Sequence, residues 1–300
     1  MRRICILAVA LVSLAVAAPA GAQVVPITLS FNNAVLTTPG LKNVVLVSPK
    51  TQPITATAQL DPGTGAFTIA PGDFNFPTYS FTTPVPGTLH VSLNNPASGQ
   101  FNPATGALTV TADYLATINL TGVGTCTADT GSQTYTTSDK TIYPGVAFPA
   151  TASGPATGPG AFTGGWPTVQ STGPACGLVS SAVNGPGGLW ISKNVSPPAL
   201  SVAAPRNATV KVGKSTTINV TVQNTGNVAA TGVSVCTTAP RSVHVTAPRC
   251  RTISTLPGKT KKTLKFKFTG TTPGKVAFKF TASGTDVTTV NTTVRAKVKR

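Results

Sequence analysis

The sequence has no glutamate, a single methionine and few charged residues, which make up 10% of its 300 positions. An ordinary soluble domain carries about 25% charged residues, and glutamate is one of the main residues from which amphipathic helices are built. Glycine (29 residues) and proline (26 residues) are frequent instead. These absences argue against a helical bundle and against a doubly wound α/β enzyme, so we expect an all-β protein.

The missing glutamate also removes most candidates for a catalytic acid. Six aspartates and two histidines, His90 and His244, remain. Asp113 falls within a strand-like run over 107–120, whereas Asp61 lies in a turn sequence. No serine occupies a Gly-x-Ser-x-Gly elbow, and no Cys-x-x-Cys pair indicates a metal site. We therefore expect no enzyme, no metal and no cofactor, with a hydrolase that uses aspartates as the poorer alternative.

The N-terminus has the three parts of a secretory signal peptide. Arg2 and Arg3 form a basic start, an apolar run covers residues 4–18, and residues 19–22 supply small side chains for cleavage. The run is too short to span a membrane comfortably, and no second apolar run follows it. We expect residues 1–22 to be removed and the protein to be secreted, with association to the cell surface as a further expectation.

Basic residues are distributed unevenly along the chain. Residues 24–200 hold four Lys and five Asp, a formal charge of −1, whereas residues 201–300 hold seventeen Lys and Arg and one Asp, a formal charge of +16. The Ser-Pro-Pro sequence at 196–198 lies at this change and is typical of a short stiff linker. We expect a signal peptide (1–22), a Gly/Pro-rich all-β domain (23–195), a linker (196–198) and a basic domain (199–300).

Four cysteines remain once the signal peptide is removed, an even number that suits disulfides in an oxidising compartment. Four cysteines allow three connectivities. Their proximity and the division into two domains favour the pairs Cys126–Cys176 and Cys236–Cys250.

Four segments of the basic domain alternate apolar and polar residues with the period of a half-buried strand. They are 216–222, 264–268, 276–280 and 294–298. Turn sequences such as Pro257-Gly258 separate them. Short antiparallel strands at this spacing over about 100 residues predict a two-sheet sandwich.

The segment from Val212 to Gly226, which ends in Val-Gln-Asn-Thr-Gly, resembles the start of CARDB and DUF11-type Ig-like modules. In those families a strand and an Asn-Thr-Gly turn precede a Gly-Val segment and a later glycine, places that 228–235 and Pro257-Gly258 occupy here. The resemblance covers about residues 199–300. It implies an extracellular Ig-like β-sandwich used as a spacer, adhesive or scaffold, with no catalytic residues to transfer.

The first domain is also expected to be all-β and sandwich-like, and it repeats a short unit of the form Asx-Pro-x-Thr/Ser-Gly. The unit starts at Asp61, Asn95 and Asn102. Asx-Pro opens a turn and glycine accepts a positive φ, so we expect each unit to connect two strands. Residues 144–188, with 11 Gly and 7 Pro, predict a loop-rich excursion anchored by a disulfide.

The bases of the second domain suggest a binding surface. If strands 263–268, 276–280 and 294–299 form one sheet, its solvent face carries six basic side chains. They are Lys265, Lys267, Lys279, Arg295, Lys297 and Lys299. Such a face attracts anionic polymers or envelope components in a salt-dependent way, but it lacks the aromatic rings that sequence-specific nucleic-acid recognition uses. The alternative is a solubilising charge that also blocks edge pairing.

Aromatic residues of the first domain supply an alternative function. Trp166 and Trp190 lie beside glycines, where an exposed ring could bind a carbohydrate or a small ligand. Packing in the core is the ordinary interpretation. We expect a secreted, non-enzymatic binding or structural protein whose basic Ig-like module contacts anionic envelope polymers. The alternative is an N-terminal domain that binds carbohydrate or a small ligand and is displayed by that module.

Overall fold

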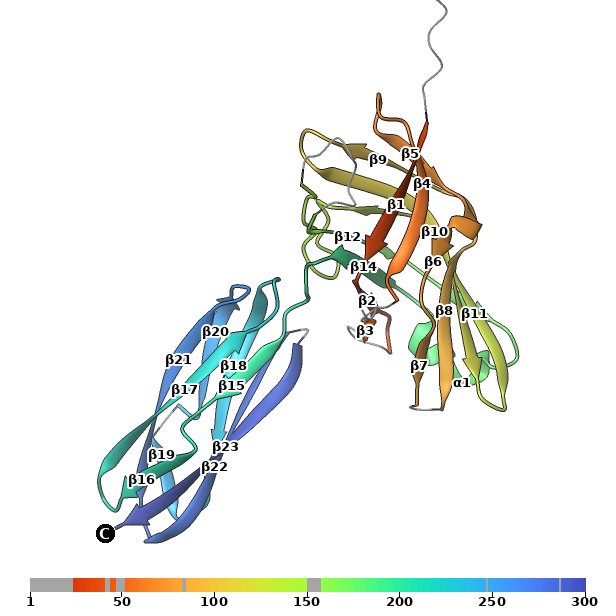
Figure 1. Cartoon of the computed structure of the whole chain (residues 1–300). Coiled ribbons are helices and arrows are strands. Elements are labelled where there is room, and N and C mark those ends of the chain that lie inside the picture. Colours follow the sequence, from red (N-terminus) through yellow and green to blue (C-terminus); the bar gives the residue numbers. More distant parts are fainter. Residues whose placement is uncertain are drawn as a thin grey trace, which may run out of the picture.

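The computed structural model describes residues 24–40, 44–46 (backbone), 52–82, 85–149, 158–246, 248–285 and 287–300. The predicted signal peptide, 1–22, lies outside these residues. Within them most residues lie in strands and there is one α-helix, which confirms the all-β prediction. Strands from 25–193 and strands from 200–299 share no sheet (Figure 1). None of the helices in the described ranges is long and apolar enough to cross a membrane.

One sheet of fourteen strands builds the N-terminal part. Its main path runs β1 (Val25–Phe31), β4 (Ile54–Leu60), β5 (Ala66–Ile69), β9 (Ala97–Asn102), β10 (Ala107–Leu120), β11 (Gly124–Thr136), β12 (Gly160–Trp166), β14 (Gly187–Lys193), β2 (Asn33–Thr37) and β3 (Val44–Leu46). Four strands branch from it: β6 (Phe74–Asn75), β7 (Tyr79–Phe81), β8 (Gly87–Leu93) and β13 (Gln170–Thr172). A short 3-10 turn (Pro71–Asp73) precedes β6.

The strand predicted over 107–120 is β10, and it is the centre of the curved sheet. Its first half pairs with β9 and its second half with β8, while β11 pairs with both halves across a register shift between Asp113 and Leu115. A bulge of this kind bends a strand and increases its twist. The inner faces of the curved sheet then meet, and Phe31 of β1 packs edge-on against Phe162 of β12 at 5.5 Å.

Two of the three repeated turn units form the hairpins that were expected. Asp61 accepts hydrogen bonds from the backbone of Gly63 and the hydroxyl of Thr64 between β4 and β5. Asn102 likewise accepts from Ala104 N at 2.9 Å between β9 and β10. The third unit differs, because Asn95 donates to Asp113 instead and the Ser and Gly that follow it belong to β9. That connection is shorter than the sequence unit.

The Gly/Pro-rich excursion contains more regular structure than expected. It holds β12, β13 and the helix α1 (Cys176–Val183), and Phe148 and Phe162 within it are buried. The predicted disulfide Cys126–Cys176 is present and ties α1 to β11. The helix was missed, although apolar residues at 176, 179 and 183 have helical spacing and a glycine follows at 185.

The C-terminal part is a sandwich of two sheets, as predicted. One has the order β15 (Leu200–Ala203), β17 (Ser215–Asn224), β21 (Lys261–Gly270), β19 (Val243–Thr246). The other has the order β16 (Asn207–Lys211), β23 (Val287–Lys299), β22 (Gly274–Thr285), β18 (Ala230–Thr238), β20 (Cys250–Leu256). Phe268 of the first sheet stacks on Phe278 of the second, with ring centroids 4.6 Å apart. The second predicted disulfide, Cys236–Cys250, joins β18 to β20.

The residues between β14 and β15 are held against both parts of the chain. Ser196 donates from its backbone and its hydroxyl to the side chain of Asn227, at 3.1 and 2.6 Å. Val228, next to it, packs in a small buried cluster with Val195 and Trp190. The predicted linker therefore makes specific contacts at the junction.

Candidate functional site

The six predicted basic residues do not share one sheet. β21 belongs to the four-stranded sheet, whereas β22 and β23 belong to the five-stranded sheet. Lys265 and Lys267 are thus exposed on one outer face of the sandwich, and Lys279 and the bases of β23 are exposed on the other. The prediction of a shared face was wrong because alternation shows which residues point outward but does not show which strands pair.

Four of the six predicted bases nevertheless lie on the five-stranded sheet, and two further bases join them there. This set, the basic face, consists of exposed residues from β16, β22 and β23. They are Lys211, Lys275, Lys279, Arg295, Lys297 and Lys299. The four phenylalanines of the module point inward and are buried, so none of them offers a ring for base stacking on this face.

Two pairs of like charges stand directly opposite each other on the basic face. Lys275 of β22 is the register partner of Lys297 of β23, and Lys211 of β16 is the partner of Lys299. Like charges in such positions destabilise a sheet. The single acid of residues 201–300, Asp286, lies outside the described residues.

The two tryptophans form no exposed platform. Trp190 is fully buried, packs edge-on against Tyr143 at 5.7 Å and donates from Nε1 to the carbonyl oxygen of Pro144 at 3.4 Å. Trp166 is 6% exposed. The ordinary interpretation, packing in the core, is therefore confirmed and the alternative of an exposed ring is contradicted, because the glycines beside the tryptophans lie in paired strands that bring the indoles inside.

Asp113 lies beside a second carboxylate, Asp129. Asn94 donates to both, at 3.2 and 3.0 Å, and Asn95 donates to Asp113 at 2.7 Å. Burial and, after it, the neighbouring Asp129 raise the pKa of Asp113. The described part of the chain holds no group of three His, Cys, Asp or Glu side chains that could bind a metal. The two amides bind Oδ2 of Asp113, whereas its buried Oδ1 has no hydrogen-bond partner among the described residues, and the pair lies beside the bulge in β10.

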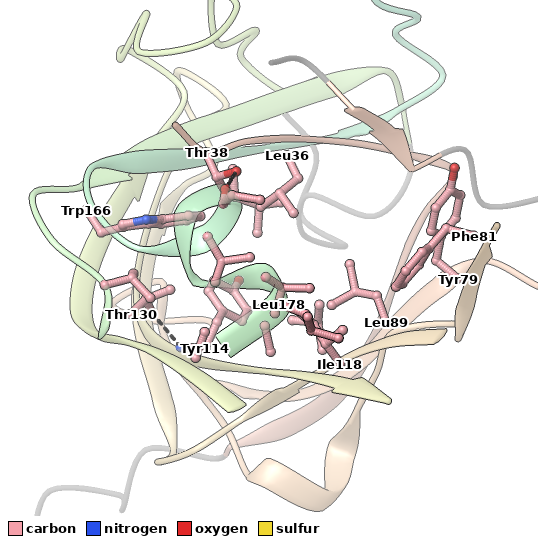
Figure 2. A pocket seen from close by; sticks show the side chains of 18 residues that line it. Leu36, Thr38, Tyr79, Phe81, Leu89, Tyr114, Ile118, Thr130, Trp166 and Leu178 are labelled. Carbon is pink, nitrogen blue, oxygen red and sulfur yellow. Dashed lines mark hydrogen bonds between the residues drawn. The ribbon is translucent and has the colours of Figure 1, made fainter. Parts of the chain in front are cut away.

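A cavity of about 290 Å³ lies inside the curved sheet of the N-terminal part. Figure 2 shows its lining side chains converging from α1 and from several strands. Trp166 and Tyr114 form parts of its wall, and α1 contributes Leu178 and Val179. The described residues of the lining include no charged side chain. Burial raises the pKa of Tyr114, so its phenol stays neutral.

Sequence reasoning missed this cavity. Its wall is made by the inward residues of amphipathic strands, such as Val91 and Ile118, which follow the same alternation as any core residue. Leu178 indicates the cavity only once the structure is known. Its large apolar side chain is exposed on α1, and it becomes informative when the helix is placed against the sheet.

Comparison with known families covers the C-terminal part. Residues 197–293 match the model of the CARDB family. This confirms the resemblance seen in the Asn-Thr-Gly motif, and it agrees with the two packed sheets of this part, since CARDB modules are Ig-like β-sandwiches. The two disulfides and this module are consistent with an extracellular location. The search of curated proteins found no match.

Among solved structures, the CARDB domain of a Pyrococcus furiosus protein, determined by NMR, is 20% identical and covers 34% of this chain and 96% of that chain, with a TM-score of 0.26. A crystal structure of that domain in complex with di-metal ions covers 35% and 94%, also at 20% identity and a TM-score of 0.26. A mutant Salmonella alpha-2-macroglobulin is 13% identical and covers 91% of this chain and 21% of that chain, with a TM-score of 0.29. TM-scores this low carry no argument about function.

Proposed function

We propose that this is a secreted, non-enzymatic binding protein whose CARDB-type module attaches it to anionic polymers of the cell envelope through the basic face. The observation that supports the proposal is the pair of directly opposed lysines, Lys275 and Lys297, on an exposed sheet. A polyanion would relieve this repulsion and release counterions, so binding should depend strongly on salt.

The test uses the full chain and two matched double variants. Lys275→Gln with Lys297→Gln removes two charges from the basic face, and Lys265→Gln with Lys267→Gln removes two from the opposite face. Binding to poly(glycerol phosphate) and to dextran sulfate is measured at about 20 mM and about 500 mM salt. We expect the first variant to lose at least about fivefold in affinity and to lower the salt slope by about 2, and the second to lose less than about twofold.

Equal losses in the two variants would show that only net charge matters and would contradict a specific basic face. If the native chain does not bind either polymer at low salt, the positive charge serves solubility and not polymer binding. The carbohydrate form of the alternative function has no support from Trp166 and Trp190, since both are buried.

A further inference from the structure

The cavity inside the N-terminal sheet is large for a protein interior. Interiors are packed as densely as organic crystals, and voids larger than a water molecule are few. An apolar cavity of roughly 150 Å³ stays dry and takes up benzene. The volume here is about 290 Å³, so on the same scale it accommodates about a dozen carbon atoms.

The chemistry of the wall limits what can enter. The two threonine hydroxyls in it are already used within the protein, whereas the buried Nε1 of Trp166 has no hydrogen-bond partner among the described residues. Thr130 Oγ1 accepts from Tyr114 N at 2.9 Å and donates to the carbonyl oxygen of Gly131 at 3.0 Å, and Thr38 Oγ1 donates to the carbonyl oxygen of Ala182. Among the described residues, no charged side chain lines the cavity to neutralise an ionised ligand. Burying an unpaired charge there would be costly, so the wall suits an uncharged, hydrocarbon-rich molecule.

The mouth of the cavity combines an apolar rim with one polar group. Leu178 of α1 lines the cavity and is 56% exposed, and the half-buried Tyr79 and Phe81 come from β7. Figure 2 shows the Tyr79 hydroxyl at the edge of the lining, pointing away from the centre. A ligand with one hydroxyl end could therefore place that group at the rim while its hydrocarbon part fills the cavity.

The wall formed by α1 is fixed in place. Its first residue is bound to β11 by the disulfide Cys126–Cys176. Near its end, the carbonyl oxygen of Ala182 accepts hydrogen bonds from Gly40 N and Thr38 Oγ1. A helix held at both ends cannot easily collapse into the space, which keeps the cavity open without a ligand. Pre-formed, mostly apolar cavities with a few polar groups are the usual form of small-molecule sites.

We propose that this cavity binds a neutral hydrocarbon molecule of about a dozen carbon atoms, such as a medium-chain alcohol, with its hydroxyl at the rim near Tyr79. The ligand inside the N-terminal part is distinct from the polymer proposed for the basic face. The two functions are independent of each other.

The chain contains its own reporter for this site. Trp166 lines the cavity and Trp190 does not, so the variant Trp190→Phe leaves a single indole at the site. We expect 1-decanol to change the fluorescence of this variant saturably and to raise the melting temperature of the native chain. The variant Trp166→Phe should show no fluorescence change. Decanoate at about pH 8 should bind at least about tenfold more weakly, because its charge finds no partner.

Matched substitutions locate the site. Ala116 of β10 faces the cavity, whereas Thr117 lies on the other face of the same strand. Ala116→Phe should weaken 1-decanol binding at least tenfold, and Thr117→Phe should leave it unchanged. Should Ala116→Phe not fold, Leu178→Lys against Ser181→Lys on α1 gives the same comparison at the mouth.

Three results would overturn the proposal: no saturable binding by the native chain, unchanged binding by the cavity variants, or equal losses in the controls. Salt separates the two functions, since 1-decanol binding should be the same at about 20 mM and about 500 mM salt while polymer binding should be lost.

Discussion

Asn224 shows how a single residue organises the C-terminal module. Its amide nitrogen donates to the carbonyl oxygens of Val228 and Leu256, at 2.8 and 3.0 Å. Its carbonyl oxygen accepts from the backbone of Gly226 and Ala199, at 3.0 and 3.2 Å. The side chain is fully buried, and all of its main hydrogen-bonding positions are used. Asn224 of the Asn-Thr-Gly motif therefore joins the end of β17 to the end of β20 and to Ala199, the residue before β15.

Replacing this side chain should be costly. Asn224→Ala leaves several buried backbone groups unpaired, and each such group costs about 1–3 kcal/mol. We expect a loss of at least about 3 kcal/mol in the free energy of unfolding of the module, measured by urea denaturation. Asn219→Ala, at an exposed position of the same strand, should cost less than about 0.5 kcal/mol. Similar losses in the two variants would contradict this role of Asn224.

Asp113 should make stability depend on pH. Because its folded pKa is raised above the ordinary value of 3.8, the folded state holds the proton more tightly than the unfolded state does. That contribution is complete below about pH 3.8 and is lost as pH rises through the folded pKa. Asp113→Asn, which does not titrate, should gain stability over the native chain between about pH 3.5 and pH 7, measured by urea unfolding. A difference that shrinks with rising pH would refute this.

At the scale of elements, α1 depends on its disulfide. The helix has eight residues and no side-chain cap, so it is too short to be stable alone. The double variant Cys126→Ser, Cys176→Ser should lower the free energy of unfolding by about 4 kcal/mol on the chain-entropy model. It should also weaken 1-decanol binding, because α1 forms part of the cavity wall. The matched variant Cys236→Ser, Cys250→Ser should cost about 3 kcal/mol and leave that binding intact.

The repulsion between the opposed lysines of the basic face should lower the stability of the module, although we propose that the same lysines bind the polymer. Lys275→Thr removes the repulsion with Lys297, and we expect a gain of about 0.2–1 kcal/mol at low salt that disappears at high salt. Lys267 faces Thr217 and Thr246 on the other sheet, so Lys267→Thr should give no such gain. Thermal unfolding at both salt concentrations measures the difference. A similar gain in stability in both variants would mean that the effect comes from the net charge and not from the opposed pair.

At the scale of the whole molecule, the junction couples the two parts. Val228 of the CARDB-type module is 8% exposed and packs with Trp190, Tyr143 and Val195. Val228→Asp would place a charge in this apolar cluster. We expect the two parts of the native chain to unfold together, in a single or nearly single calorimetric transition. In the variant we expect two separate transitions. Two well-separated transitions in the native chain would show that the junction does not couple the unfolding of the two parts.

Much of the architecture could be predicted from local patterns. The strand over 107–120, both disulfides and the strands of the basic module follow from periodicity, turn residues and cysteine placement. The helix α1 and the strands within the Gly/Pro-rich excursion were not predicted. Their residues have weak intrinsic preferences, and tertiary contacts such as the disulfide decide their conformation.

The sequence by itself determined the all-β class, the net charge of +16 in residues 201–300 and the CARDB resemblance, since each depends on composition or on neighbours along one strand. Only the tertiary structure decided that Lys265 and Lys267 face away from the bases of β22 and β23, and that inward residues of the first domain enclose a cavity. The reason is physical. Alternation shows which side chains of a strand face solvent. The sheet that a strand joins, and the volume that the sheet encloses, depend on strands that lie far away in the sequence.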